Sequence, residues 1–177
     1  MDVENTPLGK KTGRGCEPRP NAPSSWSGCD GGTSPELMNP ANQKRWLVKF
    51  APFRTPWAEI VRRGTFSLRG VRNRVARKYL TEMRSGDQVL HYHSQQELAV
   101  VGLMEVTREA YPDPTSTDPQ WLTCDFIPTQ TLVNPVTLGQ IKSEPSLATL
   151  TLIRQPRLAV MPITEQEFRI ILELSNP

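Results

Sequence analysis

The chain has 177 residues, of which 37% are hydrophobic and 22% charged, enough for one globular domain with a tail. It has no run of about 18 apolar residues, which excludes a transmembrane helix, and residues 1–15 lack the apolar core of a secretory signal. The three cysteines, Cys16, Cys29 and Cys124, are an odd number at spacings unlike those of zinc ligands. We therefore expect free thiols, no cofactor, and a cytoplasmic protein, or a nuclear one if the source is eukaryotic.

The first 45 residues differ in composition from the rest of the chain. They carry prolines at positions 7, 18, 20, 23, 35 and 40 and few large apolar side chains. Such a segment cannot bury enough surface to offset its chain entropy. We predict a disordered Pro/Gly/Ser-rich extension over 1–45 and one folded domain over 46–177. Alternatively, Met38 is the natural start, and residues 1–37 are an upstream extension without function.

In the first half of the domain, a strand and two helices are predicted. The run WLVKF favours a strand over 46–50. Thr55 and Pro56 are typical of an N-cap and first helical residue, and Gly64 would end that helix. Apolar residues at helical spacing predict a second helix over 70–83. Arg72 would then lie within its apolar face, where a guanidinium needs a partner.

The second half alternates between strands and turn signals. Strands are predicted over 87–94, 97–110 with a bend at Gly102, 120–132, 151–154 and 157–161, with a Pro-rich loop at 111–119. The pairs Thr137/Gln140 and Thr164/Glu167 are typical of capping boxes, which predicts helices near 138–143 and at the C-terminus. Without a βαβ alternation or a G-x-G-x-x-G loop, we predict an α+β fold: a small, partly open barrel of five to six strands flanked by short helices.

Charge is unevenly distributed along the domain. Residues 54–84 hold nine basic and two acidic residues, a net charge of +7, whereas residues 85–177 have a net charge of −6. Eight of the nine basic residues are arginine, which matches the geometry of phosphate and base edges better than lysine does. This segment favours contact with a nucleic-acid backbone; the alternative is a solvated helix face.

Several short strings together resemble the EVE domain family. They are WLVK at 46–49, GVRN at 70–73, YHS at 92–94, REAYPDPT at 108–115, RQ at 154–155 and RL at 157–158. This PUA-like module occurs in bacterial proteins and in the eukaryotic thymocyte nuclear protein. The resemblance implies a PUA-like β-pseudobarrel with a pocket for a single base, modified or unmodified, in DNA or RNA. The candidate base-binding residues are Trp46, Lys49, Gly70, Val71, Arg72, Asn73, Tyr92, His93, Ser94, Arg154, Gln155, Arg157 and Leu158.

Side-chain chemistry suggests which of these residues would stack on the base, which would contact its edge and which would contact phosphate. Trp46 and Tyr92 would stack on the base, or else belong to the barrel core. Amide and hydroxyl groups would meet the base edge, from Asn73, Ser94 and Gln155, although Asn73 alternatively caps a helix. Guanidinium groups would contact phosphate or carbonyl oxygens, from Arg72, Arg154 and Arg157. For Tyr111 and Asp113 we favour a role in loop structure.

The sequence departs from the family pattern at several pocket positions. Phe50-Ala51-Pro52 replaces Ser-Glu-Pro, Leu68 replaces a tryptophan, and Arg74 replaces an aromatic residue. Pro156 and Ala159 each replace a serine. The pocket walls should therefore be more apolar, so that either the ligand differs from that of relatives or the affinity is weaker.

Two other classes of function remain open. A protein-interaction module would need an exposed apolar patch. A metal-dependent enzyme could use His91 and His93, on one face of a strand, with Cys124 as a third ligand. The sequence has no G-x-S-x-G, H-E-x-x-H or Walker motif. We expect a monomeric, non-enzymatic module that binds nucleic acid and not membranes.

Overall fold

The computed structural model describes residues 43–176. Cys16, Cys29 and the predicted disorder of residues 1–42 lie outside this range. The first strand, β1 (Arg45–Phe50), begins at the predicted boundary of the folded domain.

Six strands form one mixed sheet within the described residues. The other five are β2 (Phe66–Ser67), β3 (Gln88–His93), β4 (Ala99–Pro112), β5 (Leu122–Thr137) and β6 (Val160–Ile163). Their order is β2-β5-β4-β3-β1-β6, with β1 parallel to β3 and the other neighbours antiparallel. The sheet is open because β2 and β6 are its edges. The predicted α+β fold of five to six strands with short helices is confirmed.

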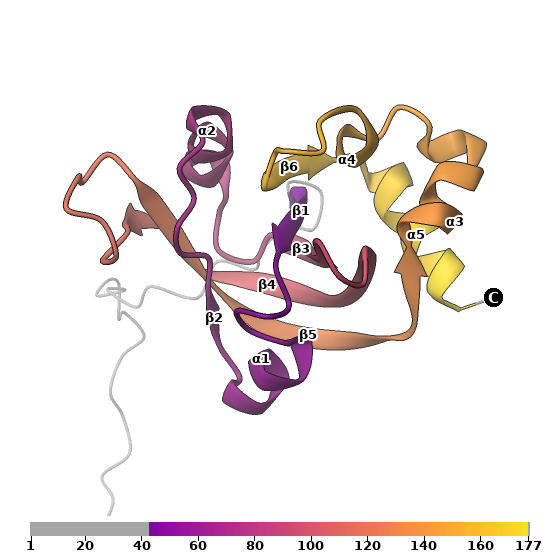
Figure 1. Ribbon diagram of the computed structural model, residues 1–177, viewed down its shortest axis with the longest axis horizontal. Coiled ribbons are helices and arrows are strands. Elements are labelled where there is room, and N and C mark those ends of the chain that lie inside the picture. The colour runs from indigo at the N-terminus through magenta and orange to yellow at the C-terminus, as the bar shows by residue number, and fades with distance from the viewer. Residues whose placement is uncertain (1–42, 177) are drawn as a thin grey trace, which may run out of the picture. The chain divides into compact units, whose positions relative to one another are not determined.

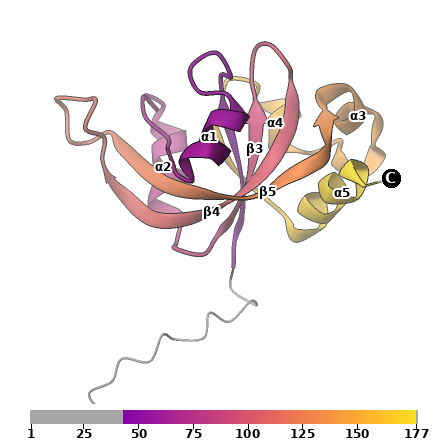
Figure 2. The ribbon, with the colours of Figure 1, turned by 90° about the horizontal axis from the view of Figure 1, so that it is seen from below.

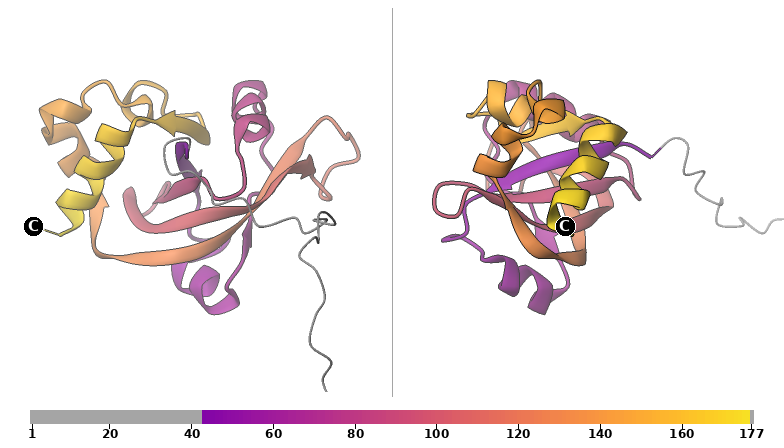
Figure 3. Two further views of the ribbon diagram at one scale, coloured as in Figure 1. Left: turned by 180° about the vertical axis from the view of Figure 1, so that it is seen from behind. Right: turned by 90° about the vertical axis from the view of Figure 1, so that its right-hand side faces the viewer.

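Short helices flank the sheet. They are α1 (Trp57–Arg63), α2 (Arg74–Glu82), α3 (Leu138–Ser143), α4 (Thr151–Arg154) and α5 (Glu165–Ser175), with a 3-10 turn, η2 (Pro145–Leu147). α1 and α2 lie on opposite sides of the strands, and α3 and α5 lie together near the C-terminal end of β5 (Figures 1, 2 and 3). Between residues 43 and 176, no helix combines the length and apolarity needed to cross a bilayer.

Local sequence signals account for several helix ends. Thr137 and Thr164 both form complete capping boxes, with Gln140 and Glu167, so both predicted helices are confirmed. Gly64 ends α1 with a φ of +67°, a conformation that favours glycine.

The start of α2 corrects the predicted helix over 70–83. The side chain of Asn73 accepts hydrogen bonds from the backbone N–H groups of Val75 and Ala76, at 2.8 and 3.1 Å, so the helix begins at Arg74. Residues 70–73 precede the helix, and the prediction that Arg72 lies on its apolar face was wrong. The alternative of Asn73 as a helix cap is confirmed.

Other boundaries also differ from the predictions. The N-cap of α1 is Pro56 and not Thr55, with no side-chain cap. The predicted strand over 151–154 is the helix α4, and the predicted strand over 157–161 is β6, which starts only at Val160. A run of four residues is too short for its period to distinguish a strand from a helix, which explains the error at 151–154. β4 and β5 both start two residues later and end further along the chain than predicted, so the loop between them lies at 113–121 instead of 111–119.

The predicted bend at Gly102 is confirmed and has a packing cause. The β4–β5 register shifts between Val100 and Gly102. The Trp57 indole of α1 lies so close that a Cβ on Gly102 would be 2.0 Å from its Cζ2 atom. Trp57 Nε1 also donates to Thr131 Oγ1 at 2.9 Å. These contacts fix α1 against the β4–β5 hairpin. They thereby also position the chain segments that precede and follow α1.

Candidate functional site

A cavity of about 310 Å³ opens between the chain after β1 and the segment before α2. We call it the pocket. Its lining residues are Lys49, Phe50, Ala51, Phe53, Arg54, Leu68, Arg69, Gly70, Val71, Arg72, Asn73, Gln95, Arg157 and Ala159. This volume lies at the lower end of the range for small-molecule sites, about 300–1,000 Å³. The pocket is therefore large enough for one small planar ligand.

The structure brings about half of the sequence-predicted site residues to this pocket. Those that line it are Lys49, Gly70, Val71, Arg72, Asn73 and Arg157. Those that do not are Trp46, Tyr92, His93, Ser94, Arg154, Gln155 and Leu158. Of the departures from the family pattern, Phe50, Ala51, Leu68 and Ala159 line the pocket, whereas Arg74 and Pro156 do not.

Both aromatic residues selected for stacking belong to the core. Trp46 is fully buried, and its Nε1 donates to Asp87 Oδ2 at 2.8 Å. Tyr92 is also buried, and its ring centre lies 5.8 Å from the Lys49 ammonium, which itself lines the pocket. Tyr92 therefore supports a pocket residue instead of lining the pocket.

The remaining predicted residues lie around the pocket. Leu158 and His93 are buried, and His93 Nδ1 bonds to Glu97. The backbone N–H of Ser94 donates to the Phe50 carbonyl at 2.9 Å. Arg154 and Gln155 are exposed at the end of α4.

Sequence reasoning missed the aromatic side chains that do line the pocket. The Phe53 ring is 60% exposed, and Phe50 is half-buried with its ring 5.0 Å from that of Phe66. The sequence signal that could have identified Phe53 is its place in a proline-containing loop, where a phenylalanine belongs to no predicted apolar pattern. Phe53 offers an accessible aromatic face at the pocket.

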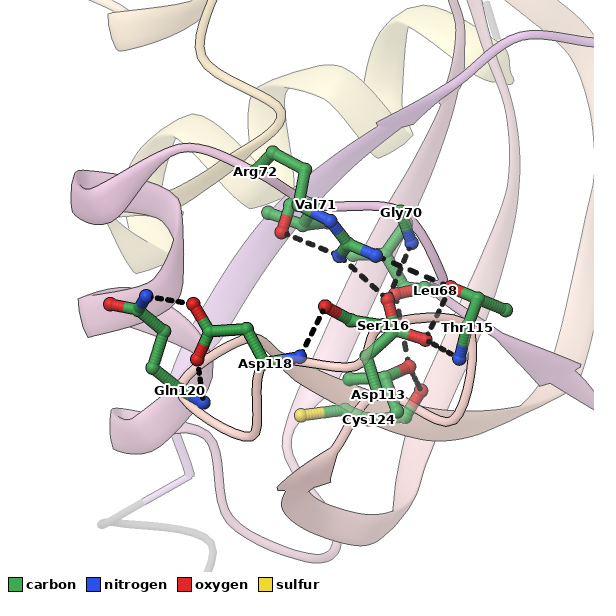
Figure 4. A network of polar contacts seen from close by, with 11 residues as sticks. Leu68, Gly70, Val71, Arg72, Asp113, Thr115, Ser116, Asp118, Gln120 and Cys124 are labelled. Carbon is green, nitrogen blue, oxygen red and sulfur yellow. Dashed lines mark hydrogen bonds and ion pairs between the residues drawn. The ribbon is translucent and has the colours of Figure 1, made fainter.

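One buried carboxylate holds the wall of the pocket in place (Figure 4). Asp113, in the loop between β4 and β5, accepts hydrogen bonds from the Gly70 N–H at 2.9 Å and from Arg72 Nη1 at 2.7 Å. It also accepts from the N–H of Thr115 at 2.9 Å and from its hydroxyl at 2.7 Å. Burial alone would raise the pKa of Asp113, but the bonds from Thr115, Arg72 and Gly70 outweigh it and hold the pKa well below its usual value.

Arg72 is held on several sides. Its side chain remains 38% exposed although Asp113 is fully buried. Its guanidinium lies 5.8 Å from the centre of the Trp121 ring, and that of Arg77 lies 5.9 Å from the same ring. Arg77 Nη1 also bonds to the Gln120 side chain at 3.1 Å. The 113–121 loop therefore fixes both the pocket wall and the start of α2.

Most of the basic segment 54–84 is not neutralised locally. Arg62 and Arg63 share Glu59, Arg72 pairs with Asp113, and Arg84 pairs with Glu109. The others form no ion pair with any residue in 43–176; they are Arg54, Arg69, Arg74, Arg77 and Lys78. Two of these line the pocket and three lie on α2, so unpaired basic side chains occur at the pocket and on the helix that follows it.

The histidine pair gives no support for a metal centre. His91 and His93 are both buried, with ring centres 5.4 Å apart. Burial raises the pKa of the Cys124 thiol to about 12, which disfavours the thiolate that metal ligation requires. No group of three or more potential ligands from His, Cys, Asp and Glu occurs within residues 43–176.

Comparison with known proteins identifies the family. The EVE domain model matches residues 44–174. Thymocyte nuclear protein 1 of Mus musculus is 34% identical over 136 residues, which cover 60% of this chain and 58% of the relative, so the chain spans less than two thirds of that protein. Among solved structures, Atu2648 from Agrobacterium tumefaciens is 34% identical with a TM-score of 0.73, covering 76% of this chain and 96% of its own.

A second solved structure contains nucleic acid. Human THYN1 protein in complex with 5-methylcytosine-containing DNA is 26% identical, with a TM-score of 0.69, covering 76% of this chain and 99% of its own. The residues that the family model matches include the GVRN and REAYPDPT strings. The chain belongs to the EVE domain family.

Proposed function

We propose that this domain is a non-enzymatic module that binds nucleic acid and holds one flipped-out base in the pocket, beside the basic helix α2. The observation that carries the proposal is a pocket with both an exposed aromatic ring, Phe53, and several unpaired basic side chains. The human THYN1 complex with 5-methylcytosine-containing DNA supports it from a relative of the same family.

The energetics of base capture fit this pocket. Removing a base from its stack costs a few kcal/mol. Stacking on an aromatic side chain returns about 1–3 kcal/mol per base, and hydrogen bonds to the base edge add to this. Phe53 provides the stacking face, while Lys49, Arg72 and Asn73 line the same pocket. Without burial in a pocket, the cost of flipping would not be recovered.

The basic helix provides binding that does not depend on sequence. Arg74, Arg77 and Lys78 lie along α2, which is capped by the pocket residue Asn73. Basic groups that neutralise phosphates release counterions, so affinity falls as salt rises. We assign the salt dependence to α2 and the selectivity for one base to the pocket.

Replacing Phe53 tests the stacking role. Phe53→Ala should weaken binding to a short oligonucleotide about tenfold, because it removes a stacking partner. Since no charge is lost, the slope of affinity against salt concentration should stay unchanged. Fluorescence anisotropy at several salt concentrations measures both quantities.

Two further variants serve as controls for this measurement. Phe53→Leu keeps apolar bulk without a ring, so it should also lose affinity. Val133→Ala removes an apolar side chain that is 71% exposed on β5, outside the pocket, and should bind normally. Unchanged binding by Phe53→Ala would exclude the stacking role, and failure of the unmodified protein to bind any oligonucleotide would refute the proposed function.

A further inference from the structure

The side chains that line the pocket offer hydrogen-bond donors and almost no acceptors. The polar ones are Lys49, Arg54, Arg69, Arg72, Asn73, Gln95 and Arg157. Lysine and arginine side chains carry donors only. The Oδ1 atom of Asn73 already accepts from Val75 and Ala76, which leaves its NH₂ group for a ligand. No carboxylate from residues 43–176 lines the pocket.

The positive charge of these donors is not balanced nearby. Arg72 pairs with Asp113 at 2.7 Å. The other four basic lining residues form no ion pair with a carboxylate in the described part of the chain. Four unpaired basic residues therefore surround one cavity.

Lys49 is half-buried, whereas the other three are exposed. Its Nζ donates to the Pro156 carbonyl and lies 5.8 Å from the centre of the Tyr92 ring. An ammonium group has three N–H donors, so two remain for a ligand. Burial lowers the pKa of Lys49, because its charge has lost part of its hydration. A bound anion would compensate for that loss.

We propose that the base held in this pocket carries an anionic oxygen group, in its simplest form a carboxylate, and not a neutral alkyl group. The inference rests on the proposed function and specifies its ligand. A carboxylate accepts charge-assisted hydrogen bonds from ammonium and guanidinium groups, which are about twice as strong as neutral ones. A methyl group would leave those donors without partners where water is displaced. A C5 substituent that ends in an amino group would place one more donor against them.

Three oligonucleotides of identical length and sequence test this assignment. Each has one central cytosine bearing hydrogen, methyl or carboxylate at C5. All three carry the same phosphates, so any difference in affinity reports the base substituent and not the backbone. The carboxylate form should bind at least about tenfold more tightly than the methyl form.

Matched variants locate the selectivity. Lys49→Met and Arg157→Met should bring the carboxylate-to-methyl ratio close to one; Arg157 is exposed, so its replacement should leave folding intact. Lys78→Met is the control, since Lys78 is exposed on α2 outside the pocket. It should weaken binding of all three oligonucleotides equally and leave the ratio unchanged. Thermal melting verifies that each variant is folded.

The outcomes separate this inference from the proposed function. Equal binding of the three oligonucleotides, or tighter binding of the methyl form, overturns the inference and leaves nucleic-acid binding in place. A ratio that persists in both pocket variants also overturns it, because the selectivity would then arise elsewhere. Failure to bind any of the three overturns the proposed function itself.

Discussion

Replacing Asp113 with alanine should destabilise the domain by about 3 kcal/mol. The fully buried carboxylate accepts from the backbone of Gly70 and Thr115, from the Thr115 hydroxyl and from Arg72, and its loss leaves these donors unpaired. Because Gly70 and Arg72 line the pocket, oligonucleotide binding should fall as well. Urea unfolding followed by tryptophan fluorescence measures the free energy of unfolding.

A carboxylate in the same loop provides the matched control. Within residues 43–176 the Asp118 carboxylate accepts hydrogen bonds only from Gln120, its neighbour in sequence, so Asp118→Ala should cost less than about 1 kcal/mol. Since the pKa of Asp113 is depressed in the folded state, its contribution is fully present above pH ~4 and is lost as the pH falls further. Equal stability of the two variants would show that the 113–121 loop does not hold the pocket wall.

His91 should make the domain sensitive to moderately acidic pH. Its ring packs among Trp57, Phe66 and His93, and neither of its ring nitrogens has a hydrogen-bond partner within residues 43–176. Burial, followed by the neighbouring His93, lowers the pKa of His91 to about 3. The unfolded chain has an ordinary histidine pKa near 6.5. At moderately acidic pH it therefore binds a proton that the folded domain does not bind.

The expected loss is about 3 kcal/mol between pH 6.5 and 4, because stability falls with pH wherever the unfolded state binds more protons. Urea unfolding of the unmodified protein and of His91→Phe at several pH values measures it, and the variant should lose most of the slope. His93→Phe is the matched control, since His91 keeps its burial there and the slope should persist. A slope unchanged in His91→Phe would show that another group titrates in this range.

Much of the fold could be predicted because its signals are local. The side-chain oxygens of Thr137 and Thr164 each accept a hydrogen bond from the backbone N–H three residues further along the chain. Because both partners are close in sequence, the sequence alone locates both helices. The run TLIR at 151–154 has too few residues for its period to distinguish strand from helix, and it was misassigned.

The site was less predictable because its contacts are remote in sequence. Arg72 and Asp113 are 41 positions apart, so no local pattern joins them. Trp46 fits a stacking role and a core role equally well by residue type, and only the folded structure shows it fully buried. Phe53 was overlooked for the converse reason, since an isolated phenylalanine in a loop belongs to no periodic pattern.

A nuclear magnetic resonance titration tests most directly whether the pocket receives a base. An oligonucleotide with a central modified cytosine and a matched one with an abasic site there would each be added to ¹⁵N-labelled protein. We expect the amide signals of Ala51, Gly70, Val71 and Asn73 to shift only with the intact base, while amides of α2 shift with both. Identical shifts with the two oligonucleotides, or shifts confined to α2, would contradict base capture.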